Sequence, residues 1–449
     1  MPPSVLDVLA AELDPDVLVT NPDVMDSFRR DRAMTVEPGH PLAVVRARDT
    51  ADVSATLRIA NDHGTPVVTR GAGSGLSGGS AAIDDCITLS TSAMRAIDVD
   101  PASMLAVVQP GLLNAEVKSA AAEHGLWYPP DPSSFEICSI GGNLATNAGG
   151  LCCVRYGVTT DYVLGLEVVI ADGTVLRLGG RTIKDVAGLD LKRLFVGSEG
   201  TLGVITEATL RLRPQPAPVS TIVGTFEDTT AAGEAVTRIM SAVRPSALEL
   251  MDHAAVAAVE AVKPMGLDGV GALLLAQTDS AADAATIADE CIRAGATYSA
   301  VSDDPDEGEM LMAARRMAIP CIERLGTVLI EDVGVPLPQI PTLLESVREV
   351  AARNDTAIPV IGHAGDGNFH PLVTFDPRDD DARQRANVAF GEVMSVALAL
   401  GGTVTGEHGV GSLKARHLDE QLGPAVTAVS RSIKAALDPK GILNPGKWL

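Results

Sequence analysis

The hydrophobic and polar positions of the chain form two kinds of pattern. Short apolar runs predict strands, and apolar residues at helical spacing predict helices. Residues 43–46 form a short apolar run typical of a buried strand. Residues 50–63 have helical spacing between Thr50, a capping residue type, and Gly64, so we expect a helix there. A second strand is expected over 66–69, directly before a glycine-rich turn.

The same pattern predicts how the chain is divided. Residues 1–36 are expected to form a helical arm, and a first domain with alternating helices and strands follows over 37–215. Residues 214–218 contain three prolines, which is typical of a linker. We expect a second domain over 216–413 and a C-terminal segment over 414–449 that begins with a helix.

The second domain has its own alternation of elements. Apolar strands are expected at 220–225 and 272–277, and alanine-rich helices at 230–243 and 280–294. This arrangement favours an α+β domain with an antiparallel sheet.

Composition and charge exclude some classes of function for this protein. The 449 residues are 46% hydrophobic and 21% charged, which is a globular balance. Acidic residues outnumber basic ones by 58 to 35, and the net charge of −23 argues against nucleic acid as a partner. No apolar run approaches the ~18–20 residues that span a bilayer, and the first residues do not resemble a signal peptide.

The six cysteines form no CxxC pair, which favours reduced thiols and a cytoplasmic protein. A peripheral position at the inner membrane stays open as an alternative.

Three glycine-rich segments indicate a ligand that lies against backbone. They are residues 70–79, 139–150 and 197–206. Backbone N–H groups of such loops can converge on a diphosphate, although one loop alone is equally typical of a mobile turn. Gly73-x-Gly75-x-x-Gly78 leads into loop and strand rather than a helix, so the pattern differs from a Rossmann motif.

Two histidine-bearing motifs suggest a metal site. His363 and His370 flank Gly365-Asp-Gly367, which permits a chain reversal that brings both rings together. Glu407 and His408 lie in a second glycine-flanked turn. Two imidazoles and a carboxylate suit Zn²⁺, Mn²⁺ or Fe²⁺. The alternative is that these are polar loop residues that bind a cofactor or water.

Arg315 lies on a predicted helix that is otherwise apolar. A charge in such a position is costly unless it is paired, and a guanidinium fits a carboxylate. The alternatives are a solvated arginine and an internal ion pair with Glu323 or Glu331.

The strings RGAGSGLSGG, DPSS, SIGGNLATNAGG, GSEGTLGVIT and ILNPGKW together resemble the FAD-linked oxidase family. That family includes vanillyl-alcohol oxidase, D-lactate dehydrogenase and the catalytic subunit of glycolate oxidase. The resemblance runs from about residue 37 to residue 449 and keeps the order of the motifs.

The resemblance implies an α+β fold with a two-part FAD-binding domain of the vanillyl-alcohol oxidase type over 37–215. It further implies an α+β substrate (cap) domain with an antiparallel sheet over 216–413, and a C-terminal segment that returns to the FAD domain. Some relatives hold FAD through a histidine at the position of Ser74, so we expect non-covalent FAD.

The resemblance also implies which residues bind FAD. They are Arg70, Gly71, Ala72, Gly73, Ser74, Gly75, Leu76, Ser77, Gly78, Pro130, Asp131, Ser133, Ser139, Ile140, Gly141, Gly142, Asn143, Thr146, Ala148, Gly149, Gly150, Gly203, Val204, Ile205 and Asn444.

In the similar 2-hydroxy-acid dehydrogenases, residues matching His363, His370 and Glu407 are metal ligands. One matching His408 is the base, and one matching Arg315 holds the substrate carboxylate. The resemblance therefore implies a divalent metal, Zn²⁺ before Mn²⁺ or Fe²⁺. It also implies an FAD-dependent D-2-hydroxy-acid dehydrogenase in which hydride passes to flavin N5.

Relatives that act on dicarboxylates have polar groups where this chain has Ile319, Ile330 and Leu372, so D-lactate or glycolate is the favoured substrate. Two alternatives stay open: an FAD-binding subunit of a glycolate-oxidase-like complex, and non-redox alkyl transfer on the same fold. An external electron acceptor is expected, either an electron-transfer protein, a quinone or a partner subunit, and a homodimer is an open alternative.

Overall fold

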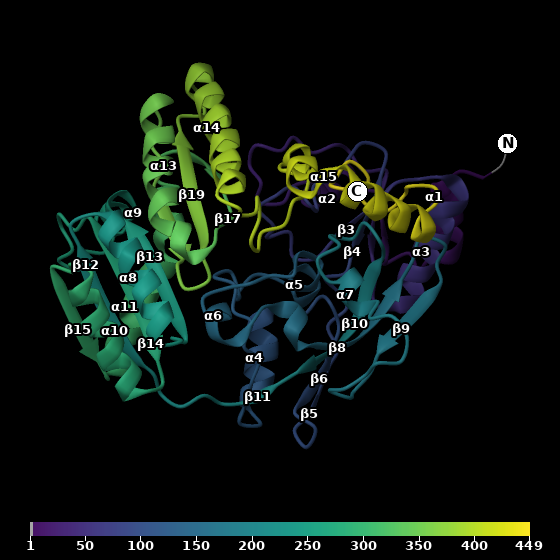
Figure 1. Ribbon diagram of the computed structural model, residues 1–449. Helices are drawn as coiled ribbons and strands as arrows, with labels where there is room; N and C mark the ends of the chain where they lie inside the picture. Colours follow the sequence, from purple (N-terminus) through teal and green to yellow (C-terminus); the bar gives the residue numbers. More distant parts are fainter. Residues whose placement is uncertain (1–2) are drawn as a thin grey trace. The chain divides into compact units, whose positions relative to one another are not determined.

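The computed structural model describes residues 3–449, and its contacts divide the chain into two units (Figure 1). Unit 1 comprises the described residues up to Gly149 together with Val158–Gln215 and Glu407–Leu449. Unit 2 comprises Gly150–Gly157 and Pro216–Gly406. Unit 2 therefore ends at Gly406, whereas the sequence analysis placed the end of the second domain at residue 413.

The first sheet of unit 1 has four strands in the order β1-β2-β4-β3. The strands are β1 (Leu18–Val19), β2 (Ala43–Arg46), β4 (Ile87–Ser90) and β3 (Val67–Arg70). β4 pairs with β2 and β3 in parallel, and β1 pairs with β2 antiparallel. The strand expected at 43–46 is confirmed, and the one expected at 66–69 begins one residue later.

The helix expected over 50–63 is α3 (Thr50–His63). Its cap is Asp49 and not Thr50, because the Asp49 carboxylate accepts the backbone N–H of Asp52. Gly64 ends the helix, as expected, and it has the left-handed conformation.

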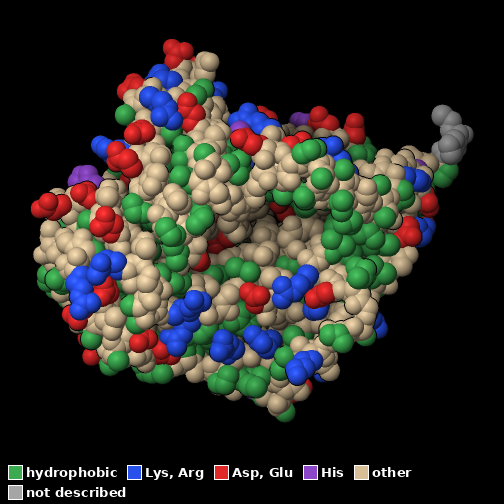
Figure 2. Space-filling view, viewed as in Figure 1, with side chains coloured by type: hydrophobic (Ala, Val, Ile, Leu, Met, Phe, Trp, Pro, Cys, Tyr) green, Lys and Arg blue, Asp and Glu red, His purple; other side chains and the backbone are tan. Residues whose placement is uncertain are grey.

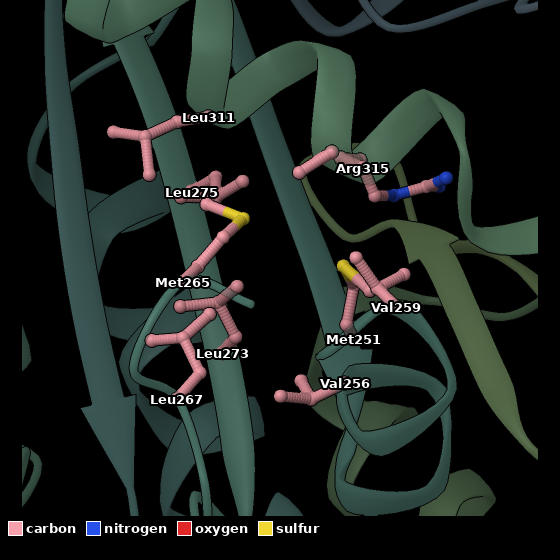
Figure 3. A pocket seen from close by; sticks show the side chains of 10 residues that line it. Met251, Val256, Val259, Met265, Leu267, Leu273, Leu275, Leu311 and Arg315 are labelled. Carbon is pink, nitrogen blue, oxygen red and sulfur yellow. The ribbon is translucent and has the colours of Figure 1, made fainter. Parts of the chain in front are cut away.

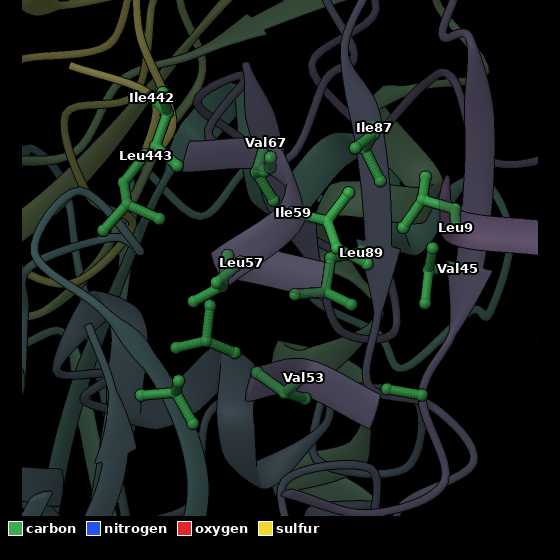
Figure 4. Close-up of a cluster of buried hydrophobic side chains, with 14 of the residues drawn as sticks. Leu9, Val45, Val53, Leu57, Ile59, Val67, Ile87, Leu89, Ile442 and Leu443 are labelled. Carbon is green, nitrogen blue, oxygen red and sulfur yellow. The ribbon is translucent and has the colours of Figure 1, made fainter. Parts of the chain in front are cut away.

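The N-terminal arm is only partly helical. It contains α1 (Val5–Glu12), β1 and the short α2 (Pro22–Asp26), and residues 1–2 of the predicted arm lie outside the described residues. Apolar side chains of α1 and α3 pack with those of the first sheet, and Figure 4 shows Leu9, Leu57 and Leu89 in this cluster.

The second sheet of unit 1 is antiparallel throughout. Its order is β5 (Ile97–Asp100), β6 (Leu105–Val108), β10 (Val204–Arg211), β8 (Val163–Val169) and β9 (Val175–Gly179). A separate pair joins β7 (Leu126–Trp127) to β11 (Arg213–Pro214), so the expected proline linker begins inside a strand. The connecting helices are α4 (Asn114–Ala122), α5 (Ile140–Thr146), η1 (Thr159–Tyr162) and α7 (Lys192–Phe195).

The C-terminal segment packs into unit 1. It begins with α15 (Ala415–Leu437), which is broken at Gly423 and Pro424. The Asn444 N–H then donates to the Val67 carbonyl at 2.8 Å, and Ile442 and Leu443 join the core of the first sheet (Figure 4). The expected return of the C-terminus to the first domain is therefore confirmed.

Unit 2 is built on an antiparallel sheet, as expected. Its order is β15 (Tyr298–Ser302), β12 (Ser220–Phe226), β14 (Ala272–Thr278), β13 (Ala247–Asp252), β18 (Val360–His363), β19 (Asn368–Phe375) and β16 (Thr327–Ile330), and β17 (Val333–Gly334) also pairs with β19.

Helices of unit 2 cover both faces of this sheet. They are α6 (Cys153–Tyr156), α8 (Thr229–Ala242), α9 (His253–Glu260), α10 (Ala281–Arg293), α11 (Pro305–Arg316), α12 (Ala318–Ile322), η2 (Leu337–Gln339), α13 (Ile340–Arg353) and α14 (Asp380–Ala399). Gly224 of β12 faces Cys291 of α10, whereas Thr221 faces Gly308 of α11, so α10 and α11 lie on opposite faces.

Within residues 3–449, no helix has the length and apolar character to cross a membrane. Figure 2 shows acidic and basic side chains interspersed on the face in view.

Candidate functional site

The first two glycine-rich segments meet at Ser139. Ser139 caps α5, and its Oγ accepts the backbone N–H of Gly142 at 3.3 Å and that of Ala72 at 3.2 Å. A Cβ on Gly71 would lie 2.3 Å from Ser139 Oγ, so only glycine permits this approach. The loop after β3 is thus fastened to the start of α5.

The loop also closes over the side chain of Arg70. Arg70 is buried, and its Nη1 donates to the Arg30 carbonyl at 2.6 Å. Gly73 has φ +72°, and a Cβ there would come within 2.1 Å of the Arg70 guanidinium. Burial lowers the pKa of Arg70, and Asp31 opposes this shift.

Other residues expected at the cofactor have partners within unit 1. Asn143 Oδ1 accepts Asn114 Nδ2 at 3.0 Å, and Thr146 Oγ1 donates to the Gly142 carbonyl at 3.2 Å. A Cβ on Gly203 would lie 2.7 Å from Val168 Cγ1, so this glycine packs directly on β8. These three residues therefore shape the backbone around α5 and β10.

The remaining residues expected at the cofactor differ in exposure. Ser77, Gly78, Pro130, Ile140, Ala148, Gly149, Gly150, Val204 and Ile205 are buried, Ser74, Leu76, Asp131, Gly141 and Gly142 are half-buried, and Ala72, Gly75 and Ser133 are exposed.

The third glycine-rich segment holds the loop that follows Glu407. Glu199, in the left-handed conformation at φ +51°, accepts the backbone N–H groups of Val410 and Gly411, both at 2.8 Å. Ser77 Oγ donates to the Gly409 carbonyl at 2.7 Å and lies 3.1 Å from the His408 carbonyl. The backbone of 408–411 is thus held from two sides within unit 1.

Glu199 is a buried carboxyl that the sequence analysis did not single out. Burial raises its pKa to about 7, although the two N–H donors and nearby lysines act in the opposite direction. Asn444 Nδ2 donates to the Glu199 carbonyl at 2.7 Å and to the Gly79 carbonyl at 2.9 Å. Asn444 therefore joins the first and third glycine-rich segments.

In unit 2, the chain reversal between the two histidines is present. β18 ends at His363 and β19 starts at Asn368, and these two residues face each other in the ladder. The imidazole centroids of His363 and His370 lie 5.2 Å apart with the rings at 84°. Both residues are 3% exposed.

Arg315 is also 3% exposed, at the end of α11. Its Nη2 lies 2.8 Å from Glu249 Oε2, so the partner is neither Glu323 nor Glu331, the two considered from the sequence. Glu249 also lies against His363, whose Nδ1 is 2.8 Å from Oε1. A carboxylate on β13 therefore joins the histidine motif to the arginine.

A small apolar hollow lies on the same face of β13. It is lined by Met251, Val256, Val259, Met265, Leu267, Leu273, Leu275, Leu311, Ala314 and Arg315. Figure 3 shows the aliphatic stem of Arg315 at its edge, with the guanidinium directed away from Leu273 and Leu275.

The chain before Glu407 is fixed by a second buried carboxylate. Thr405 Oγ1 and the Gly406 N–H donate to Asp332 Oδ2 at 2.6 and 2.9 Å. His370 Nδ1 lies 3.6 Å from Asp332 Oδ1. Glu407 follows Gly406 directly and begins the last segment of unit 1, where its Oε1 lies 3.7 Å from His408 Nε2.

Sequence reasoning missed Glu249 and Asp332. Each of the two residues interrupts an apolar run. Glu249 lies within Ala247-Leu-Glu-Leu-Met251, and Asp332 lies within Val328-Leu-Ile-Glu-Asp-Val333. A carboxylate in such a run is rarely buried without a partner, and this was the available signal.

Comparisons with known proteins identify the family. Residues 41–179 match the family described as "FAD binding domain", and residues 215–448 match "FAD linked oxidases, C-terminal domain". The glycolate oxidase subunit GlcD of Bacillus subtilis is 41% identical over 91% of this chain and 88% of its own length. The D-lactate dehydrogenase of Archaeoglobus fulgidus is 37% identical over 94% and 95%, respectively.

Among solved structures, p-cresol methylhydroxylase aligns with a TM-score of 0.82 at 17% identity, over 99% of this chain and 96% of its own. This likeness confirms the expected fold, that of vanillyl-alcohol-oxidase-type enzymes. The extent and identity of the sequence matches establish that the chain belongs to the FAD-linked oxidase family.

Proposed function

We propose that this protein is an FAD-dependent D-2-hydroxy-acid dehydrogenase, with D-lactate or glycolate as the favoured substrate and the 2-oxo acid as product. The observation that carries the proposal is the high identity, over nearly the whole chain, to relatives named glycolate oxidase subunit and D-lactate dehydrogenase. When bound, non-covalent FAD supplies N5 as the hydride acceptor.

A divalent metal fits the histidine pair of unit 2. His363 directs Nδ1 at Glu249, so Nε2 is its proposed ligand atom, and His370 lies beside it. With Glu407 as the third ligand, the donor set is two nitrogens and one oxygen, which favours Zn²⁺ over Mn²⁺ or Fe²⁺ as the proposed ion. Such an ion supplies Lewis acidity that lowers the pKa of a ligated hydroxyl.

Arg315 is the proposed anchor of the substrate carboxylate. Its Nε is buried and has no hydrogen-bond partner among the described residues, although Nη2 lies against Glu249. A buried guanidinium with an unused donor is suited to an incoming carboxylate.

His408 is the proposed base that removes the hydroxyl proton. An imidazole is suited to this task near neutral pH. Its backbone carbonyl is within hydrogen-bond distance of Ser77 Oγ, and the residues that follow it are fixed by Glu199. These contacts fix the backbone that carries the imidazole, which supports the role because a general base needs a defined position.

A small monocarboxylate is favoured over a dicarboxylate. Ile330 and Leu372 face each other across β16 and β19 and are both buried, and Ile319 is half-buried. None of these side chains offers a polar contact to a second carboxylate.

The test is anaerobic reduction of the purified yellow protein with a panel of 2-hydroxy acids. We expect D-lactate or glycolate to bleach the flavin absorbance, with L-lactate as the stereochemical control. If no acid of the panel bleaches the flavin, the proposal is refuted.

We also propose that electrons leave through an external acceptor, either a partner subunit, an electron-transfer protein or a quinone. The word "subunit" in the name of the Bacillus subtilis relative favours an assembly. Reduced enzyme that is mixed anaerobically with quinone or with fractionated cell extract should become yellow again, and failure with both contradicts this part.

A further inference from the structure

One buried carboxylate of unit 2 serves two partners. Glu249 is 1% exposed, and its side chain is fully enclosed. His363 Nδ1 lies 2.8 Å from Oε1 and 3.0 Å from Oε2, while Arg315 Nη2 lies 2.8 Å from Oε2. An isolated carboxylate at this depth would be strongly destabilising, so its burial depends on these partners.

The contact with Glu249 determines which ring nitrogen of His363 carries the proton. An ionised carboxylate only accepts hydrogen bonds, so the proton between His363 and Glu249 belongs to Nδ1. A neutral imidazole with its proton on Nδ1 has its lone pair on Nε2.

The strands make this arrangement rigid. Glu249 of β13 and His363 of β18 are direct partners in the antiparallel ladder. Arg315 reaches the same carboxylate from α11, which covers this face of the sheet. A rotation of the Glu249 side chain would therefore displace the imidazole and the guanidinium together.

We propose that Glu249 is a positioning residue that holds His363 as an Nε2 metal ligand and, with its other oxygen, holds Arg315 for the substrate carboxylate. The inference rests on the proposed function, because it names the residue that sets the geometry of that site. Carboxylates that orient metal-ligating histidines typically change metal affinity by about 10- to 100-fold when they are removed.

The test measures the affinity of the FAD-loaded enzyme for Zn²⁺ by competition with a chromogenic chelator. We expect Glu249→Gln to weaken Zn²⁺ binding by about 10- to 100-fold, since the amide lacks the charge that orients Nδ1–H. The matched control is Glu290→Gln, because Glu290 is also a buried carboxylate of unit 2 and is held by Arg238 and Arg293 without a histidine. This control should keep the wild-type affinity.

A double variant guards against misfolding. Glu249→Met with Arg315→Met removes both charges and leaves neither one buried alone. It should lose Zn²⁺ affinity to the same extent as Glu249→Gln. At saturating Zn²⁺, Glu249→Gln should recover kcat while its KM for D-lactate stays raised, because Arg315 has lost its anchor.

A His363→Ala variant distinguishes a failure of the proposed metal site from a failure of the proposed role of Glu249. If His363→Ala binds Zn²⁺ as tightly as the wild type, the metal site of the proposed function is wrong. If His363→Ala loses Zn²⁺ but Glu249→Gln and the double variant keep wild-type affinity, the role of Glu249 is overturned and the metal site stands.

Discussion

Glu199 makes the stability of unit 1 depend on pH in a direction that can be measured. Its carboxyl is buried and its pKa is raised from 4.5 to about 7 by that burial. A raised pKa means that the folded chain holds the proton more tightly than the unfolded chain does. The stabilisation is therefore complete below pH 4.5 and is lost as the pH rises through 7.

The magnitude follows from the size of the shift. One pKa unit corresponds to ~1.4 kcal/mol, so the whole effect is roughly 3 kcal/mol. Between pH 5 and pH 8, roughly 2–3 kcal/mol of it should disappear from the wild type but not from Glu199→Gln, which has no proton to lose. As the pH rises from 5 to 8, the unfolding free energy of the wild type should therefore fall relative to that of Glu199→Gln.

The assay is urea unfolding at one fixed, saturating FAD concentration. Trp127 and Trp448 are the only two tryptophans of the chain, and both belong to unit 1. Their fluorescence thus reports the unfolding of this unit, and comparison of two variants cancels the contribution of all other titrating groups.

Glu167→Gln is the matched control. Burial raises the pKa of Glu167, but hydrogen bonds from Thr50, Arg177 and Thr206 outweigh it and keep the pKa below its ordinary value. Glu167 therefore stays ionised from pH 5 to 8, and its variant should differ from the wild type by a constant amount. A difference between wild type and Glu199→Gln that is equally constant over this range refutes the reasoning.

Three further predictions concern the end of α15, the loop after β3 and the proposed base. Lys434→Met should destabilise unit 1 by about 3–5 kcal/mol in the same urea assay, because it leaves the enclosed Asp438 carboxylate without its cation at 2.6 Å; an unchanged midpoint would contradict this. Gly71→Ala should weaken FAD binding in a titration of the apoprotein, since its Cβ would lie 2.3 Å from Ser139 Oγ, whereas Gly180→Ala, which has open space, should not. His408→Ala should retain FAD but slow anaerobic flavin reduction by D-lactate at least ~10²-fold, and fast reduction would exclude His408 as the base.

The sequence predicts a helix or strand correctly where the pattern of neighbouring residues alone determines it. The apolar run at 43–46 and the helical spacing at 50–63 give the observed bounds, since they depend on neighbouring residues only. The cap was assigned to the wrong residue because Asp49 and Thr50 are both capping types, and only the backbone geometry distinguishes them.

The histidine motif was also predictable, whereas its surroundings were not. The glycines between His363 and His370 indicate the reversal within a stretch of only eight residues. Glu249 is 114 residues away from His363, and the two meet only because β13 and β18 are neighbours in the sheet. Strand order is a property of the whole fold, so the true partner of Arg315 could not be chosen from nearby glutamates.

The ion pair of Arg315 with Glu249 changes how an acidic chain would attract an anionic substrate. The chain has a net charge of −23, and Arg315 adds no net positive charge at its site because Glu249 balances it. Under the proposed function, Arg315 therefore contributes directed hydrogen bonds at short range rather than long-range attraction. A divalent ion would bring two positive charges to this site, so the metal is the group that would compensate the substrate carboxylate. Removal of the metal should consequently raise KM for a 2-hydroxy acid even where Arg315 is intact.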